Sequence, residues 1–378
     1  MTLEFLQHYW FIVIATLGGL LVFLMFVQGA NTQLIHKGLT STQRRMIVNS
    51  TGRKWELAFT CLVTFGGAFF ASFPLFYSTS FGGAYWVWVL LLVTFVFQAV
   101  SYEFQNKKEN LLGSRTFQWF LALNGLLAPL LIGTAVGTFF TGSDFSVDKM
   151  AMAQNISPTI SVWGNSWHGL EAVPTPALFL GLTVMFLDMC LGSLYIINNI
   201  DDEATLALTR KSLRWQSLLF LASLVAWLAF LFTMEGYAVA EDGTVFFAAG
   251  KYLRNLLQMP VVAALFLLGA FMVVVGIWQG IFTRSVRGIW PAGMGTVLVV
   301  VALFIVAGFN GTAYYPSYSN LQSSLTITNS SSSLFTLKTM FFISLLVPFV
   351  VAYIAFVWRK MDQKPITPDE IQGSEDKY

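Results

Sequence analysis

Three carboxylic acids lie inside or next to long apolar stretches of the sequence: Glu56, Glu103 and Asp188. A carboxyl group in such surroundings can take up and pass on protons, or take part in an ion site. A charge at the centre of a bilayer costs about 2.5–3.5 kcal/mol on insertion scales, so an acid placed there needs a partner or a purpose. These three residues are therefore the first candidates for chemistry.

Asp188 lies near the middle of the apolar stretch 177–197. Its helical face combines small and polar residues at steps of three and four, as a contact between membrane helices does; these residues are Gly181, Gly192, Tyr195 and Asn199. Two interpretations stay open. Asp188 is either a protonatable relay or ion-site residue, or a neutral carboxylic acid hydrogen-bonded to a neighbouring helix.

Glu56 begins the apolar stretch 55–77, and a partly polar stripe follows it on the same helical face. The stripe contains Thr60, Thr64 and Gly67. It could lead protons inward from the cytoplasm. The alternative is that Glu56 only complements the helix dipole, an effect of roughly 0.3–1 kcal/mol, and the residues alone favour this alternative.

Glu103 follows the stretch 85–101, at a helix end where the dipole disfavours an anion. Lys107, four residues later, could pair with it in the favourable Glu-to-Lys order. By the topology given below, Glu56 and Glu103 reach the same cytoplasmic surface. Two carboxylates on sequential helices at one membrane face predict a point of proton uptake.

Haem and metal sites are not favoured in this chain. The three histidines, His8, His36 and His168, fall at a helix edge and in two loops on different sides, so no pair can face across a bundle. The methionines within apolar stretches fit packing better than ligation. No cluster of His, Cys and carboxylates occurs at metal-ligand spacing. We therefore expect this chain alone to hold no cofactor and no metal.

The composition defines the elements that must position these residues. Of 378 residues, 56% are hydrophobic and only 11% are charged, against about a quarter charged in a soluble domain. The apolar residues form blocks long enough to span a bilayer as helices. The net charge of +2 offers no basic field for nucleic acid, so nucleic-acid partners are excluded. The chain is predicted to be an all-α, polytopic membrane protein.

Nine spans are predicted, at residues 9–28, 55–77, 85–101, 117–140, 177–197, 217–234, 260–282, 289–308 and 336–358. Among the 21 Lys and Arg, only Lys149, Lys251, Arg254 and Lys338 fall in segments after even-numbered spans or at the start of the ninth. Because positive loops stay in the cytoplasm, the N-terminus is predicted outside and the C-terminus inside. The outside loops are then the long ones, and the Ser-rich loop 310–335 is expected to be solvated or loosely packed. Residues 362–378 are predicted to form a disordered cytoplasmic tail.

Several stretches together resemble subunit II of the cytochrome bd quinol oxidases. They are residues 66–74 (GGAFFASFP), 98–104 (QAVSYEF), 124–148 and 325–361, and the length and the order of spans match along nearly the whole chain. The resemblance implies two four-helix bundles plus a peripheral helix. It divides the chain into a first bundle (1–140), an outside loop (141–176), a second bundle (177–308), an outside loop (309–335), a ninth helix (336–361) and the tail (362–378).

The resemblance also implies a function. The complex would be an electrogenic respiratory terminal oxidase of a prokaryotic cytoplasmic membrane that oxidises quinol and reduces oxygen to water. Haem b and haem d would belong to subunit I, and this chain, not catalytic alone, would support subunit I and contribute a cytoplasmic proton path. A small accessory subunit, quinone and lipid are the further partners expected. The rival interpretation is a secondary transporter, in which Asp188 would be a midplane acid.

The site residues follow from the resemblance residue by residue. The family's Trp-Asp pair that opens helix 2 corresponds to Trp55-Glu56, and its acid that ends helix 3 corresponds to Glu103. Three positions depart from the family pattern: residues 28–31 read QGAN where an acidic stretch is frequent, Gln98 replaces a common Arg, and Cys61 replaces a Trp. The expected proton path therefore comprises Trp55, Glu56, Gln98 and Glu103.

Overall fold

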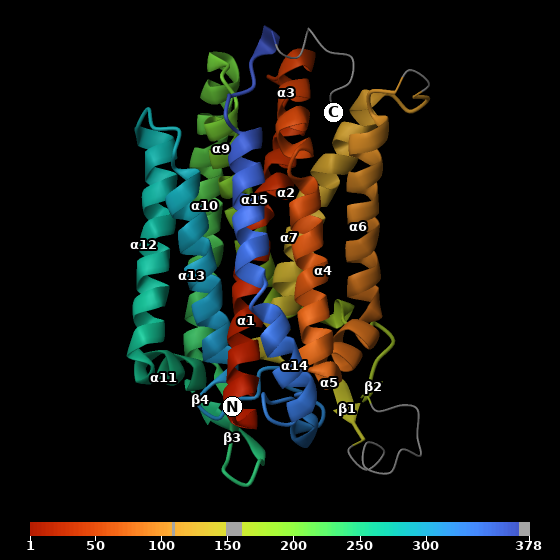
Figure 1. Ribbon diagram of the computed structural model, residues 1–378, viewed down its shortest axis with the longest axis vertical. Coiled ribbons are helices and arrows are strands. Elements are labelled where there is room, and N and C mark those ends of the chain that lie inside the picture. The colour runs from red at the N-terminus through yellow and green to blue at the C-terminus, as the bar shows by residue number, and fades with distance from the viewer. Residues whose placement is uncertain (108–109, 149–160, 370–378) are drawn as a thin grey trace.

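The computed structural model describes residues 1–107, 110–148 and 161–369. Within these residues, nine helical segments are long and apolar enough to cross a membrane. They run side by side as an elongated bundle (Figure 1). One end of this bundle carries helix α3 (Ser41–Gly52), and we call it the α3 end. The other carries two short β-hairpins, and we call it the hairpin end.

The first half of the chain contains four of the spans. Their helices, with the short turns that join them, are α1 (Leu3–Leu24), α2 (Phe26–Asn31), η1 (Thr32–Ile35), α3, α4 (Trp55–Ser72), α5 (Pro74–Tyr77), η2 (Ser78–Gly82), α6 (Tyr85–Phe104) and α7 (Ser114–Thr141). α4 ends earlier than the apolar pattern predicts, because the residue before Pro74 is disfavoured in a helical conformation. α3 was not predicted as a helix. Its first turn is stabilised by a capping box, in which Thr40 and Gln43 each accept a bond from the other's backbone N–H.

The second half contains the remaining five spans. Its helices are α9 (Ala177–Asn199), α10 (Glu203–Thr233), α11 (Lys251–Gln258), α12 (Pro260–Phe282), α13 (Ile289–Gly308), α14 (Leu334–Ser344) and α15 (Val347–Met361). α12 and α13 have the predicted bounds, and α14 and α15 together form the ninth span. α10 begins well before the predicted residue 217 because its polar first half extends beyond the apolar stretch.

The hairpin end is built from loop segments. Antiparallel strands β1 (Phe145–Val147) and β2 (Ser161–Trp163) form one sheet, and β3 (Glu235–Val239) and β4 (Val245–Ala249) form the other. The turns η3 (Leu170–Ala172) and η4 (Leu321–Ser323) lie in the neighbouring loops. The expectation of a loosely packed loop 310–335 is wrong. Tyr314, Leu325 and Ile327 are buried, and the Tyr314 hydroxyl lies 2.8 Å from Ser330 Oγ.

The expectation of a disordered tail is also wrong for residues 362–368. Ile366 is fully buried and forms a parallel bridge with Ile200, and its backbone N–H donates to the Asn199 carbonyl at 2.8 Å. A polar composition predicted disorder here, but Ile366 fits against the end of α9 and Asp362 bonds to Lys54 and Asn199, and together these contacts dock the segment. The remainder of the predicted tail, 370–378, lies outside the described residues.

Candidate functional site

Two aromatic rings join the α3 ends of α4 and α6. Trp55, the first residue of α4, stacks on Tyr102 of α6 with ring centroids 5.9 Å apart and an interplanar angle of 18°. A second ring contact lies further from the α3 end. It joins Phe59, about one turn along α4 from Trp55, to Phe95, about two turns along α6 from Tyr102, with ring centroids 5.5 Å apart. Each ring of the stack directly precedes a predicted site acid in the sequence, so Glu56 and Glu103 lie at the α3 ends of two helices that these rings join.

Both acids are exposed on the surface of the chain. Within the described residues neither carboxylate has a hydrogen bond or an ion pair, so the predicted pairing of Glu103 with Lys107 is absent from this structure. Thr60, Thr64 and Gly67, the stripe beyond Glu56, are exposed as well. α4 thus carries an exposed polar stripe on a membrane-spanning helix, next to exposed apolar residues such as Val63 and Phe70.

A buried group of amide side chains lies behind this surface. Gln98 of α6 is fully buried, and its Oε1 accepts a hydrogen bond from Gln28 Nε2 at 3.2 Å. The Tyr102 hydroxyl donates to Asn31 Oδ1 at 3.0 Å. Two positions at which this chain departs from the family pattern, 28–31 and 98, therefore lie against each other. A neutral pair of amides here needs no compensating charge, unlike a buried ion pair.

Several polar atoms of this group have no hydrogen-bond partner among the residues that the structure describes. They are Gln28 Oε1, Gln98 Nε2, Asn31 Nδ2 and Trp55 Nε1, all buried. Buried polar groups in native proteins are almost always hydrogen-bonded, to ordered water where protein groups are lacking. These orphan atoms are therefore suited to hold water between the acids and the interior of the bundle.

A buried ion pair next to this site was missed by sequence reasoning. Lys54 Nζ lies 2.7 Å from Asp362 Oδ1, and the lysine side chain is fully buried. Asn199 Nδ2 donates to the same Asp362 oxygen at 3.0 Å, and Ser50 Oγ donates to Asn199 Oδ1 at 2.6 Å. The pair attaches the end of α15 to the start of α4. The only signal in the sequence was a basic and an acidic residue at the boundaries of two apolar blocks.

Asp188 lies in the interior, away from the exposed acids. Its backbone packs directly on α2, where a Cβ on Gly29 would come within 1.7 Å of the Asp188 carbonyl oxygen. The side chain is fully buried, and neither carboxyl oxygen has a hydrogen-bond partner among the described residues. The predicted hydrogen bond to a neighbouring helix is therefore not present, which leaves the acid without a structural partner.

The histidines do not suit a haem in this chain. His8 Nδ1 lies 2.9 Å from the Glu4 carbonyl, His36 Nδ1 accepts from Gly38 N–H at 3.1 Å, and His168 Nδ1 lies 3.1 Å from the Gly83 carbonyl. No two of them share a contact in the described structure, and its searched residues contain no group of three metal-ligating side chains. The three histidines thus form no pair that could ligate one haem from both sides, and the searched residues form no cluster of metal ligands.

The described part of the chain is a multi-span helical membrane bundle with two exposed acids near one end. A sequence profile of the cytochrome bd terminal oxidase subunit II family matches residues 6–361. The chain belongs to that family, and so to a quinol oxidase complex, an oxidoreductase of the bacterial inner membrane.

Individual proteins agree with this assignment. The chain is 26% identical to cytochrome bd-I ubiquinol oxidase subunit 2 of Escherichia coli K12 over 98% of its length and 97% of that protein. It is 26% identical to cytochrome bd ubiquinol oxidase subunit 2 of Bacillus subtilis 168, over 96% and 99% of the two chains. The bd oxidase structure from Geobacillus thermodenitrificans matches the fold with a TM-score of 0.65 at 13% identity, covering 94% and 98%. The transporter interpretation is not supported.

Proposed function

We propose that this chain supports the haem-bearing subunit I of its complex and supplies a proton path that begins at Glu56 and Glu103. The α3 end is then the cytoplasmic end. The haems and the oxidation of quinol are assigned to the partner subunit, so this chain is not catalytic alone. A small accessory subunit, lipid and quinone complete the proposed surroundings.

One observation carries the proton path: the exposed polar stripe of Glu56, Thr60 and Thr64 on a membrane-spanning helix. The Thr64 hydroxyl already donates to the Thr60 carbonyl at 2.8 Å, but hydrocarbon cannot hydrogen-bond to the Glu56 carboxylate, and ionisable residues in spans face protein or a water-filled cavity. The stripe leaves this chain on its outer surface. The partner subunit is therefore proposed to cover it, with the path running along the interface.

The inner amide group supports a continuation of the path. The Trp55 and Tyr102 stack contacts the buried amide group, because the Tyr102 hydroxyl donates to Asn31 Oδ1. Neutral amides can orient water without trapping a proton, because they neither ionise near neutral pH nor bind a counter-charge. Glu56 and Glu103 would take up protons, Trp55 would position the stack, and Gln98 would hold water behind it.

The experiment is the double variant Glu56→Gln with Glu103→Gln in the whole purified complex. We expect oxygen consumption per haem to fall by roughly 10²-fold or more, because positioned proton transfer accelerates reactions by about 10²–10⁴-fold. Haem content and subunit assembly should stay normal, because glutamine keeps the shape of glutamate.

Glu203→Gln is the matched control, since Glu203 is also exposed at the α3 end in the first turn of a spanning helix. It should leave turnover unchanged. Normal turnover per haem in a fully assembled double variant would contradict the proposed path and move proton uptake to the partner subunit.

A further inference from the structure

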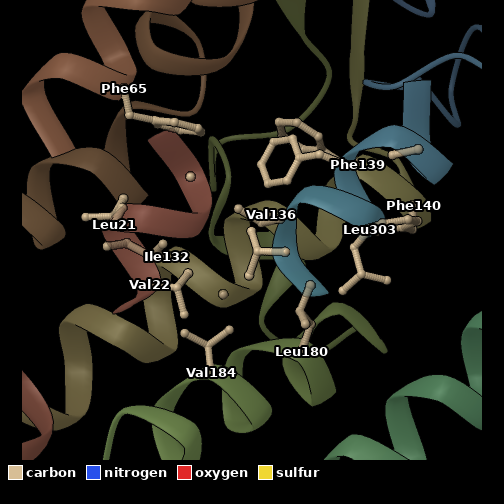
Figure 2. Close-up of a pocket in the computed structure, with 15 residues that line it drawn as sticks. Leu21, Val22, Phe65, Ile132, Val136, Phe139, Phe140, Leu180, Val184 and Leu303 are labelled. Carbon is tan, nitrogen blue, oxygen red and sulfur yellow. The ribbon is translucent and has the colours of Figure 1, made fainter. Parts of the chain in front are cut away.

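The bundle contains an apolar cavity that the proposed proton path does not use. Its volume is about 50 Å³, and it lies between α1, α4, α7, α9 and α13. Figure 2 shows the side chains that surround it, among them Leu21, Phe65, Ile132, Val136 and Leu303. All these elements belong to membrane spans, so the cavity lies within the membrane-embedded part of the subunit.

Water is not expected in this cavity, because its lining is apolar. Each of its lining residues is Gly, Ala, Val, Leu, Ile or Phe. A buried water needs two to four polar partners, and apolar cavities without them stay dry. In this respect the cavity differs from the amide group around Gln98, where buried polar atoms without a protein partner can bind water.

The size of the cavity limits an apolar occupant. A dry cavity of about 150 Å³ binds benzene or xenon, and the present one, at about 50 Å³, has about a third of that volume. A quinone ring is larger than benzene, and its carbonyl oxygens would find no hydrogen-bond donor here, which makes their burial costly. A molecule of two atoms without polar groups fits both the volume and the lining.

We propose that this cavity is a binding site for a small apolar gas, and that dioxygen, the substrate of the oxidase, is the gas that occupies it in the membrane. The favourable contacts are dispersion contacts with the surrounding aliphatic and phenyl groups, which an empty cavity lacks. The site then holds a single dioxygen molecule inside the membrane-embedded part of subunit II. It rests on the membership of the oxidase family and is independent of the proton path.

Xenon is the probe for this site, applied under pressure to the whole purified complex before structure determination. A single density peak is expected between Phe65, Val136 and Leu303, and added dioxygen should reduce its occupancy by competition. Val136→Phe should abolish the peak because the phenyl ring fills the space. Val225→Phe is the matched control, since Val225 on α10 is 65% exposed on the outside of the bundle, and it should keep the peak.

If the phenylalanine variant fails to assemble, Ala307→Val at the cavity wall is the gentler substitution, with the same expected loss of xenon. Haem content reports assembly in every case. A wild-type complex without a xenon peak at this position would overturn the proposal. Continuous density of a lipid or isoprenoid chain, or an ordered water, in the cavity would overturn it as well.

Discussion

At the scale of single residues, the three acids differ in what the fold offers them. Glu56 and Glu103 are exposed at adjacent helix ends, whereas Asp188 is fully buried without a hydrogen-bond partner among the described residues. A carboxyl group that gains no bond contributes nothing to packing that an apolar residue would not. Of the two interpretations of Asp188, we therefore propose the protonatable relay and not the structural hydrogen bond.

Substitution of Asp188 by asparagine should retain assembly and haem content, because the carboxamide has nearly the same size and needs no charge. We expect slower oxygen consumption per haem, since asparagine cannot exchange a proton. Asp188→Leu should change the stability of the complex by less than roughly 1 kcal/mol, because no protein hydrogen bond is lost. An oxygen electrode measures the oxygen consumption, and thermal unfolding measures the stability of the complex.

Thr183→Val is the control within α9, because the Thr183 hydroxyl donates to the Phe179 carbonyl of its own helix and, among the described residues, to no other group. Its turnover should be unchanged. Full turnover in the assembled asparagine variant would return Asp188 to a purely structural role.

At the scale of elements, α3 and α10 are joined through their N-terminal caps. Asp202 caps α10 by accepting from the Thr205 N–H at 2.8 Å and from the Thr205 hydroxyl at 2.6 Å. Gln43, which completes the capping box of α3, donates its Nε2 to the same Asp202 oxygen at 2.9 Å. Partial burial alone would raise the pKa of Asp202, but the hydrogen bonds from Thr205 and Gln43 hold the pKa below its usual value.

This lowered pKa predicts a pH dependence of stability. A carboxyl whose pKa is lower in the folded state stabilises the fold above its unfolded pKa of about 3.9, and this stabilisation is lost as the pH falls through the folded value. Asp202→Ala should therefore lower the thermal midpoint near pH 7, by the equivalent of roughly 0.5–2 kcal/mol for a lost cap. The difference from wild type should vanish in strong acid.

Asp242→Ala provides a comparison, because the pKa of Asp242 is likewise lowered by hydrogen bonds, from Thr244, but in an exposed turn that joins no helices. We expect a smaller loss of stability there. A difference between Asp202→Ala and wild type that stays constant from pH 7 to pH 3 would show that the carboxylate charge is not involved.

At the scale of the whole molecule, charge and cofactor chemistry both point to a subunit that depends on a partner. The basic residues of the described chain gather at the α3 end, apart from Lys251, Arg254 and Lys338 near the hairpin end. This distribution supports the proposed cytoplasmic placement of the α3 end. Membership of the subunit II family implies a partner subunit I, and we propose that this partner covers the polar stripe on α4.

Expression of this chain without its partner should yield a colourless membrane protein with no quinol oxidase activity. The reason is that its histidines are engaged in separate local contacts and do not converge on one site. The visible spectrum of the purified chain is the measurement, and co-expression with subunit I is the control that should restore haem bands. A stoichiometric haem spectrum from the isolated chain would show that it holds the cofactor itself.

The sequence by itself determined the membrane class, the nine spans and the family. Apolar blocks of spanning length need no tertiary information, because the bilayer requires each span to satisfy its backbone hydrogen bonds within its own helix. This is why α12 and α13 have the predicted bounds. The sequence also predicted that Glu56 and Glu103 lie at the same end of the bundle. The stack of Trp55 on Tyr102 agrees with this prediction.

Only the tertiary structure decided which distant residues meet. Lys54 and Asp362 are 308 positions apart, and Gln28 and Gln98 are 70 apart, so no local period connects them. The loop around Tyr314 was predicted to be solvated or loosely packed and the tail with Ile366 to be disordered, because composition reports average polarity and not the few side chains that fill a matching surface. The apolar cavity has the same origin: it is the space that five helices leave between them, and helix periodicity does not encode it.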